Sequence, residues 1–152
     1  MKPITINVPK GHKASFDEAT SEITFSEIPL DVKERILTFE DVLKEMKVDP
    51  KEFIKSLENL TSDEVAYKRL KLITAAFNEG WTPDWTNGQW DKFTAYFTMG
   101  GSSGVGFSFF GCGNRGSGSH VGSRLVFKSA DLAKHVGKLF IDDFRDFLTL
   151  NQ

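Results

Sequence analysis

This sequence has a single cysteine, no long apolar run and no strong excess of charge of either sign. Cys112 has no second thiol for an internal disulfide, which indicates a reducing compartment. No stretch approaches the roughly 20 apolar residues that a membrane span needs, and the N-terminus lacks the apolar run of a signal peptide. These absences predict a soluble intracellular protein that makes no membrane contact.

The charge balance and the histidine positions exclude two further classes of protein. A formal net charge of −2 over 152 residues argues against a dedicated nucleic-acid-binding protein. His12, His120 and His135 show no metal-ligand spacing, and a chain of this length folds without a metal or a disulfide. We therefore expect one domain over residues 1–152, with no cofactor and no metal.

The hydrophobic pattern predicts an α+β protein whose elements follow the order ββ–ααα–βββ–α. In residues 1–30, apolar and polar side chains alternate twice across a polar turn, which is typical of half-buried strands. The first alternation contains Ile4, Ile6 and Val8, and the second contains Ile23 and Phe25. This region is predicted to form a β-hairpin.

Residues 38–80 show the start signals of three helices. Thr38, Asp49 and Thr61 are candidate N-caps, because each can accept hydrogen bonds from the free N–H groups of a first helical turn. Pro50 directly after Asp49 strengthens the second start. The third helix has an apolar stripe at helical spacing: Ala66, Leu70, Ile73 and Phe77.

Residues 89–128 alternate as three strands of an antiparallel sheet, at 89–99, 105–110 and 123–128. Residues 129–150 are predicted to form one amphipathic helix capped by Ser129, and Gly137 is expected to allow close packing on a strand. The helix stripe is expected to cover the apolar face of the sheet. The expected core residues are Phe93, Phe97, Phe107, Phe109, Leu125, Phe127, Leu132, Val136, Phe140 and Phe144.

Nine of the thirteen glycines fall within residues 100–122. Residues 111–116 match a G-x-G-x-x-G nucleotide loop, although the motif requires a following helix and a strand is expected here. Cys112 and His120 could form a nucleophile and its base in a small enzyme, if the hairpin brings them together. Glycine and serine loops can also bind a partner directly. The favoured interpretation is structural, with glycines forming turns and bulges in a curved hairpin.

The sheet face opposite the expected core carries basic side chains interleaved with aromatic ones. Such a surface suits stacking on bases or sugars, with cations for phosphates. The competing interpretation is that the helices of residues 38–79 bury this face. Five residues would form the binding surface: Trp90, Lys92, Tyr96, Arg124 and Lys128.

Two segments resemble a group of small uncharacterised proteins encoded by phages and prophages of gut Bacteroidetes. They are NEGWTPDW at residues 78–85 and VGSRLVFKS at 121–129, the latter continuing to GKLF at 137–140. The similarity covers residues 64–150 best. It implies a protein of a mobile element, in the cytoplasm of a bacterial host or in a virion, and it supplies no catalytic residues.

Together these patterns predict a non-enzymatic binding or assembly module. Its expected partner is a protein, with nucleic acid as a further possibility through the basic and aromatic sheet face. The alternative is a small enzyme that uses Cys112 with His120, or a nucleotide-binding loop at residues 111–116.

Overall fold

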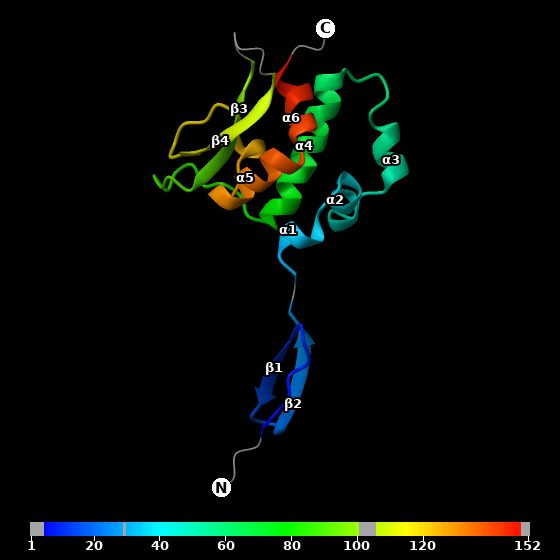
Figure 1. Cartoon of the computed structure of the whole chain (residues 1–152), viewed down its shortest axis with the longest axis vertical. Helices are drawn as coiled ribbons and strands as arrows, with labels where there is room; N and C mark the ends of the chain where they lie inside the picture. The colour runs from blue at the N-terminus through cyan, green and yellow to red at the C-terminus, as the bar shows by residue number, and fades with distance from the viewer. Residues whose placement is uncertain (1–4, 29, 101–105, 150–152) are drawn as a thin grey trace. The chain divides into compact units, whose positions relative to one another are not determined.

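A computed structural model describes residues 5–28, 30–100 and 106–149 of the chain. Within these residues it contains six α-helices, one short 3-10 helix and two separate two-stranded antiparallel sheets (Figure 1), which confirms the α+β class. None of the described helices is both long and apolar enough to cross a membrane. The chain divides into two compact units, Met1–Asp31 and Val32–Gln152. The single domain over 1–152 stays a prediction, because a domain is defined by independent folding rather than by grouped contacts.

The first unit is a β-hairpin of β1 (His12–Asp17) and β2 (Glu22–Glu27). The side chain of Asp17 organises the turn, since its Oδ1 accepts hydrogen bonds from the backbone N–H groups of Ala19 and Thr20 at 2.8 and 3.3 Å. Ser21 completes the turn with a positive φ of 56°. The hairpin is thus closed by a local polar turn.

The predicted hairpin is present, but the sequence placed its first strand wrongly. Ile6 and Val8 lie outside both strands, and Ile4 lies outside the described residues. Pro9 lacks the N–H group that a strand ladder uses, and Gly11 turns the chain with a φ of 78°. The strand therefore begins after this turn, in residues that the sequence suggested were a polar loop.

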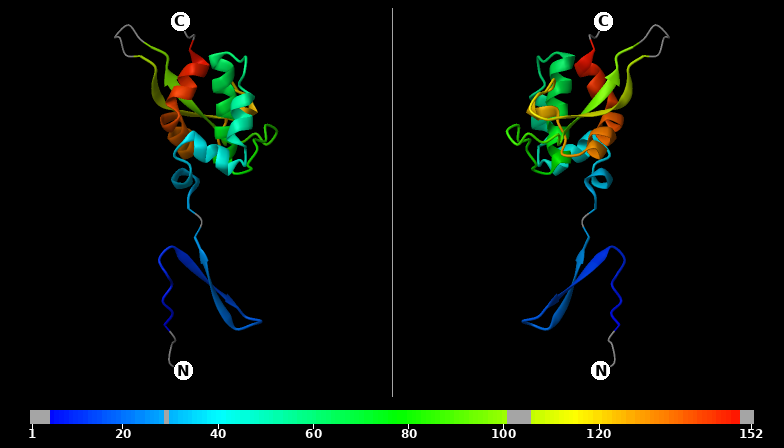
Figure 2. Two further views of the ribbon diagram at one scale, coloured as in Figure 1. Left: turned by 90° about the vertical axis from the view of Figure 1, so that its right-hand side faces the viewer. Right: turned by 90° about the vertical axis from the view of Figure 1, so that its left-hand side faces the viewer.

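The second unit is built in layers, which Figures 1 and 2 show from three directions. β3 (Lys92–Thr98) and β4 (Ser108–Arg115) form the sheet, and α5 (Ala130–Leu139) packs against both strands. α6 (Ile141–Leu148) packs against α4 (Ser62–Asn78), which also contacts α2 (Phe39–Glu45). The remaining helices are α1 (Val32–Arg35), which the sequence did not predict, and α3 (Pro50–Lys55).

The three predicted central helices are confirmed, together with their caps. Thr38 and Asp41 form a reciprocal capping box, as do Thr61 and Glu64, and Asp49 accepts from two backbone N–H groups. Each cap satisfies donors that the helix itself leaves free. The predicted stripe of α4 is buried at every position: Ala66, Leu70, Ile73 and Phe77.

The third predicted strand of the sheet is wrong. Ser123–Leu125 form a 3-10 turn, and only a single bridge between Phe93 and Phe127 links the following segment to β3. On its other side this segment bonds to a helix side chain, because Asn78 Nδ2 donates to the Val126 carbonyl at 2.8 Å and Asn78 Oδ1 accepts from the Lys128 N–H at 3.0 Å. The amide takes the place of a strand partner.

The predicted C-terminal helix is interrupted at Phe140, where φ is −112° and ψ is 37°. Because of this break, α5 packs on the sheet and α6 packs on α4. One straight helix could not follow both directions. Phe140 then packs on Phe77 and Phe144 on Phe97, with ring centroids 6.1 and 4.7 Å apart. The expected cover of the sheet is confirmed for α5, which packs on both strands, and for Phe144, whereas Phe140 packs on α4 instead of the sheet. Val105 and the predicted helix end at residue 150 lie outside the described residues.

Gly137 has the packing role that the sequence suggested. A Cβ atom at this position would lie 2.9 Å from the Cβ of Ala95 and 2.8 Å from the Phe109 ring. Both distances are shorter than van der Waals contact, so α5 approaches the sheet more closely than any larger residue would permit.

Candidate functional site

The outward face of the β3–β4 sheet is shaped by a bulge and by glycine. The pairing shifts between Tyr96 and Phe97, which leaves Phe110 as the extra residue of β4, 80% exposed. The Tyr96 ring lies across Gly113, where a Cβ atom would come within 2.7 Å of a ring carbon. The Arg115 guanidinium lies 5.4 Å from the centre of the same ring. A bulge was expected in this region, and it is present.

Trp90 stands directly before this sheet and is 64% exposed. Its backbone carbonyl accepts a hydrogen bond from Asn114 Nδ2 at 3.2 Å, and its indole lies 3.5 Å from where a Cβ of Gly116 would be. Beside it is a hollow of about 560 Å³, lined by Trp90, Arg115, Gly116, Ser117, Gly118, Ser119 and His120. We call Trp90, Tyr96, Arg115 and His120 the Trp90 surface.

Trp90 and Tyr96 each lie beside Arg115, but Lys92 is not part of this exposed face. Lys92 is fully buried. Its ammonium group donates to Asn87 Oδ1 at 2.7 Å and pairs with Asp91 at 2.6 Å. This lysine holds the loop before β3 in place, and it lowers the pKa of the Asp91 carboxyl.

Arg124 and Lys128 lie at other places than the Trp90 surface. Lys128 bonds to Glu79 at 2.8 Å, and Arg35 bonds to the second oxygen of the same carboxylate at 2.7 Å. Both cations lower the pKa of Glu79, and the hydrogen bond from Lys128 has the largest effect. Arg124 is exposed at the edge of a different hollow. The predicted surface of five residues is thus divided among four environments.

The two sequence segments at 78–85 and 121–129 fold against each other. Trp85 Nε1 donates to Ser123 Oγ at 2.7 Å, in addition to the two bonds of Asn78. The hollow where these segments meet α4 measures about 310 Å³ and is lined by Lys71, Thr74, Ala75, Asn78, Trp81, Thr82, Pro83, Ser123 and Arg124. The sequence alone did not show that these two segments, which are far apart in the chain, pack against each other in the fold.

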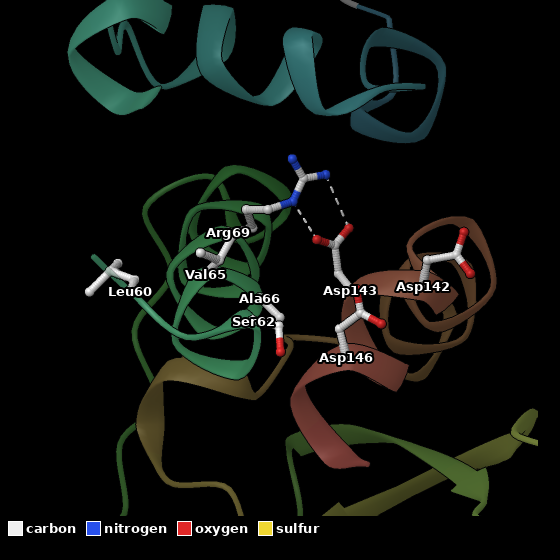
Figure 3. A pocket seen from close by; sticks show the side chains of 8 residues that line it. All are labelled: Leu60, Ser62, Val65, Ala66, Arg69, Asp142, Asp143 and Asp146. Carbon is white, nitrogen blue, oxygen red and sulfur yellow. Dashed lines mark hydrogen bonds and ion pairs between the residues drawn. The ribbon is translucent and has the colours of Figure 1, made fainter. Parts of the chain in front are cut away.

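A third hollow, of about 380 Å³, lies between α4 and α6 (Figure 3). Arg69 and Asp143 point toward one another there and form a two-bond ion pair, whose second bond measures 3.3 Å. Asp142, Asp143 and Asp146 fall on the polar side of the predicted C-terminal helix, which favours a solvated face for all three. That interpretation is wrong for Asp143, which is buried because Arg69 neutralises it.

The Arg69 guanidinium also lies 3.8 Å from the centre of the Phe39 ring. Its contacts consequently connect α2, α4 and α6. This arrangement stabilises the helical layer, and the third hollow is a structural feature of it.

The glycine motif at residues 111–116 is not a loop, because residues 111–115 belong to β4 and pair with β3. Cys112 opposes Ala95 and packs against the core, while His120 lines the hollow beside Trp90. Within the described ranges, no hydrogen bond joins this thiol to this imidazole. In the same part of the chain, no three histidine, cysteine or acidic side chains converge to hold a metal ion.

Sequence reasoning missed Arg115 and placed His120 only beside Cys112. The sheet register brings Arg115 opposite Lys92, and that register depends on the bulge. The only signal in the sequence for Arg115 was its position directly before a segment rich in glycine and serine. Comparison of the chain with protein-family models, curated proteins and solved structures gives no match.

Proposed function

We propose that this chain is a non-enzymatic binding or assembly module of phage or prophage type, and that a protein partner binds at the Trp90 surface. The resemblance of residues 64–150 supports the mobile-element setting, in a bacterial cytoplasm or a virion. The observation that carries the proposal is Trp90 itself, a tryptophan 64% exposed at the edge of a hollow. Burying such a ring in a partner is strongly favourable.

The composition of the surface favours a protein partner. Tryptophan, tyrosine and arginine are the residue types that dominate binding energy in protein interfaces, and here Trp90 and Tyr96 each lie beside Arg115. Trp90 is held by Asn114 and Gly116, and Tyr96 by Gly113. Because these rings are already positioned, binding costs less conformational entropy.

Single-stranded nucleic acid is the second candidate, and one observation favours it. The flat Tyr96 ring and the exposed Trp90 indole could each stack on a base, with Arg115 available for a phosphate. Arg115 is the one arginine or lysine of the Trp90 surface, because Lys92 is buried and Lys128 is paired to Glu79 elsewhere. A protein therefore remains the first candidate.

The protein candidate is tested by a photo-crosslinking amino acid at position 90 in host cells. Ile54 serves as the matched control position, because it is an apolar residue of similar exposure, 66%, on α3. A discrete protein should be crosslinked from position 90 and not from position 54. Its affinity should fall by about 30-fold on Trp90→Ala, which corresponds to about 2 kcal/mol. An unchanged affinity would contradict the proposal.

The nucleic-acid candidate is tested by fluorescence polarisation with labelled single strands of DNA and RNA. Binding that weakens with salt and is lost in both Trp90→Ala and Arg115→Ala supports this candidate. If the wild-type chain shows no salt-dependent binding, the candidate is rejected and the protein partner stands alone.

A further inference from the structure

One face of α4 lines a hollow that is not part of the Trp90 surface. This hollow of about 310 Å³ lies where α4 meets the segments 78–85 and 121–129. Four of its residues follow the i, i+3, i+4, i+7 spacing of a single helix face: Lys71, Thr74, Ala75 and Asn78. We call it the Thr74 hollow. Its volume lies at the lower end of the range for small-molecule sites, roughly 300–1,000 Å³.

The most buried residues of the Thr74 hollow are polar. Thr74 is 3% exposed and Asn78 is 4% exposed. The Asn78 amide is already engaged, since it donates to the Val126 carbonyl and accepts from the Lys128 N–H. Thr74 Oγ1 differs, because it is buried and has no hydrogen-bond partner in the part of the chain that the structure describes. A buried hydroxyl without a partner is unfavourable, so a ligand group that bonds to it is strongly favoured.

The charged residues of the hollow are all basic. Lys71 comes from α4 and Arg124 from the 3-10 turn Ser123–Leu125, and none of the residues that line the hollow is acidic. Neither cation forms an ion pair within the described ranges. The Lys71 ammonium lies 4.9 Å from the centre of the Tyr67 ring, a contact that does not neutralise its charge. Two cations without a carboxylate between them attract an anion.

Trp81 and Pro83 give the same hollow an apolar wall. Trp81 is half-buried and belongs to the lining. The face of an indole is a stacking surface for a planar ring, and arginine binds phosphate through two parallel hydrogen bonds. The Thr74 hollow therefore combines cations, an aromatic wall and a buried polar group, which are the groups that recognise a phosphorylated ring compound.

We propose that the Thr74 hollow binds a small phosphorylated molecule with a planar ring, of the nucleoside monophosphate class. The phosphate binds Arg124 and Lys71, the ring lies against Trp81, and a polar atom of the ligand bonds to Thr74 Oγ1. Because Asn78 ties the two segments together, the site exists before the ligand arrives, which lowers the entropy cost of binding.

This site and the Trp90 surface fail independently as proposals, because their two hollows share no lining residue. Trp90→Ala should leave binding of the monophosphate unchanged. Arg124→Gln should leave the protein that is crosslinked from position 90 unchanged. The site is also separate from the glycine motif at residues 111–116, which belongs to none of the residues that line it.

The first experiment is isothermal titration calorimetry of the full chain with the four ribonucleoside 5′-monophosphates. The four nucleosides and inorganic phosphate are titrated beside them, so that the ring and the phosphate are tested separately. At least one monophosphate should bind in the micromolar range, about 10-fold more tightly than its nucleoside and than inorganic phosphate.

The second experiment repeats the titration with variants of the two cations. Arg124→Gln and Lys71→Gln should each weaken binding of the same monophosphate by about 10-fold, since each removes a charge-assisted hydrogen bond. The matched control is Lys134→Gln, which removes the same charge at an exposed position of α5 and should bind as the wild type does.

Thr74→Val separates a binding role from a structural one. Valine keeps the shape of threonine and removes a buried hydroxyl that lacks a partner. Without ligand, the variant should therefore melt at or above the wild-type temperature. With the monophosphate, it should bind about 10-fold more weakly. A hydroxyl with a purely structural role would give a lower melting temperature and unchanged binding.

Four results would overturn the inference. The site is rejected if no monophosphate binds at millimolar concentration. Inorganic phosphate that binds as tightly as every monophosphate would exclude the planar ring. A folded Arg124→Gln variant with an unchanged dissociation constant would place the ligand elsewhere. Finally, a Thr74→Val variant that melts lower and binds as the wild type does would show that this hydroxyl serves the fold alone.

Discussion

The described part of the chain contains two antiparallel sheets of two strands each, and they differ in what lies against them. In the second unit α5 packs on β3 and β4, and Phe93 and Phe97 of β3 are half-buried against the core. In the first unit Phe16 and Phe25 have similar chemistry and remain exposed. Apolar residues on a strand therefore predict which face will be covered, while the covering element decides whether burial is achieved.

The same contrast separates stability from interaction in this chain. The helices and the sheet of Val32–Gln152 bury one another's apolar faces. The Trp90 surface and the hollow beside it remain exposed. The hairpin of the first unit lacks such an internal arrangement. Four changes in the second unit test this contrast, taken from the largest expected effect to the smallest.

Phe140→Ala should reduce the free energy of unfolding by about 3–5 kcal/mol, because it opens a cavity between α5, α6 and α4. Phe140 is buried and touches Phe77 edge-on. Phe16→Ala is the matched control in the hairpin, and it should leave the melting of the second unit within error. Chemical denaturation measures both. Equal effects of the two substitutions would remove the contrast between the units.

Asn78→Ala should cost about 2–3 kcal/mol, since it leaves the Val126 carbonyl and the Lys128 N–H without their partner at a mostly buried position. Asn87 is exposed, but it is not a suitable control. Its side chain accepts a hydrogen bond from Lys92, so its substitution would alter the loop before β3. Gln89→Ala is suitable because Gln89 is an exposed amide side chain whose backbone φ is not positive. A loss no larger than that of the control would mean that the single bridge to Phe93 suffices to hold residues 126–128.

Gly137→Ala should destabilise the second unit by about 1 kcal/mol, even though alanine favours a helix. The added methyl group would meet Ala95 and Phe109 at distances below 3 Å, and overpacking of this kind costs about 1–3 kcal/mol against a helix gain of about 1. Lys134→Ala, at an exposed position of the same helix, is the control. A more stable Gly137→Ala variant would show that α5 does not approach the sheet this closely.

The smallest effect concerns pH. Lys128 and Arg35 lower the pKa of Glu79 below its ordinary value of 4.5. A lowered folded-state pKa stabilises the protein above the ordinary value, and this contribution is lost as the pH falls through the lower folded value. Glu79→Gln should therefore lower the melting temperature slightly near neutral pH and reduce its fall in acid. Exposed Glu40→Gln is the control, and identical acid profiles for wild type and Glu79→Gln would contradict this account.

Local signals predicted much of this fold correctly. The caps at Thr38, Asp49 and Thr61 depend on short stretches of chain, as does the buried stripe of α4, and all are present. The errors concern partners that are distant in sequence. The strand expected at 123–128 failed because Asn78 provides the hydrogen bonds that a neighbouring strand would otherwise give.

The candidate site was predictable only in part, for the same reason. Trp90 and Tyr96 are exposed, as the sequence predicted, although Trp90 lies before β3 and not on it. Lys92 has the same parity, yet it is buried because the loop before β3 folds over it and supplies Asn87 and Asp91 as partners. Arg115 joins the surface through a register that a bulge sets.

By itself the sequence determined the caps of the three central helices, the buried stripe of α4 and the alternation of β3, because each depends on residues a few positions apart. Only the tertiary structure decided where the sheet ends, where the C-terminal helix breaks, and which aromatic residues stay exposed. The physical reason is that hydrogen bonding and apolar burial are satisfied by whichever group lies nearest in space. Alternation along the chain identifies the face that needs a partner, and it cannot identify that partner.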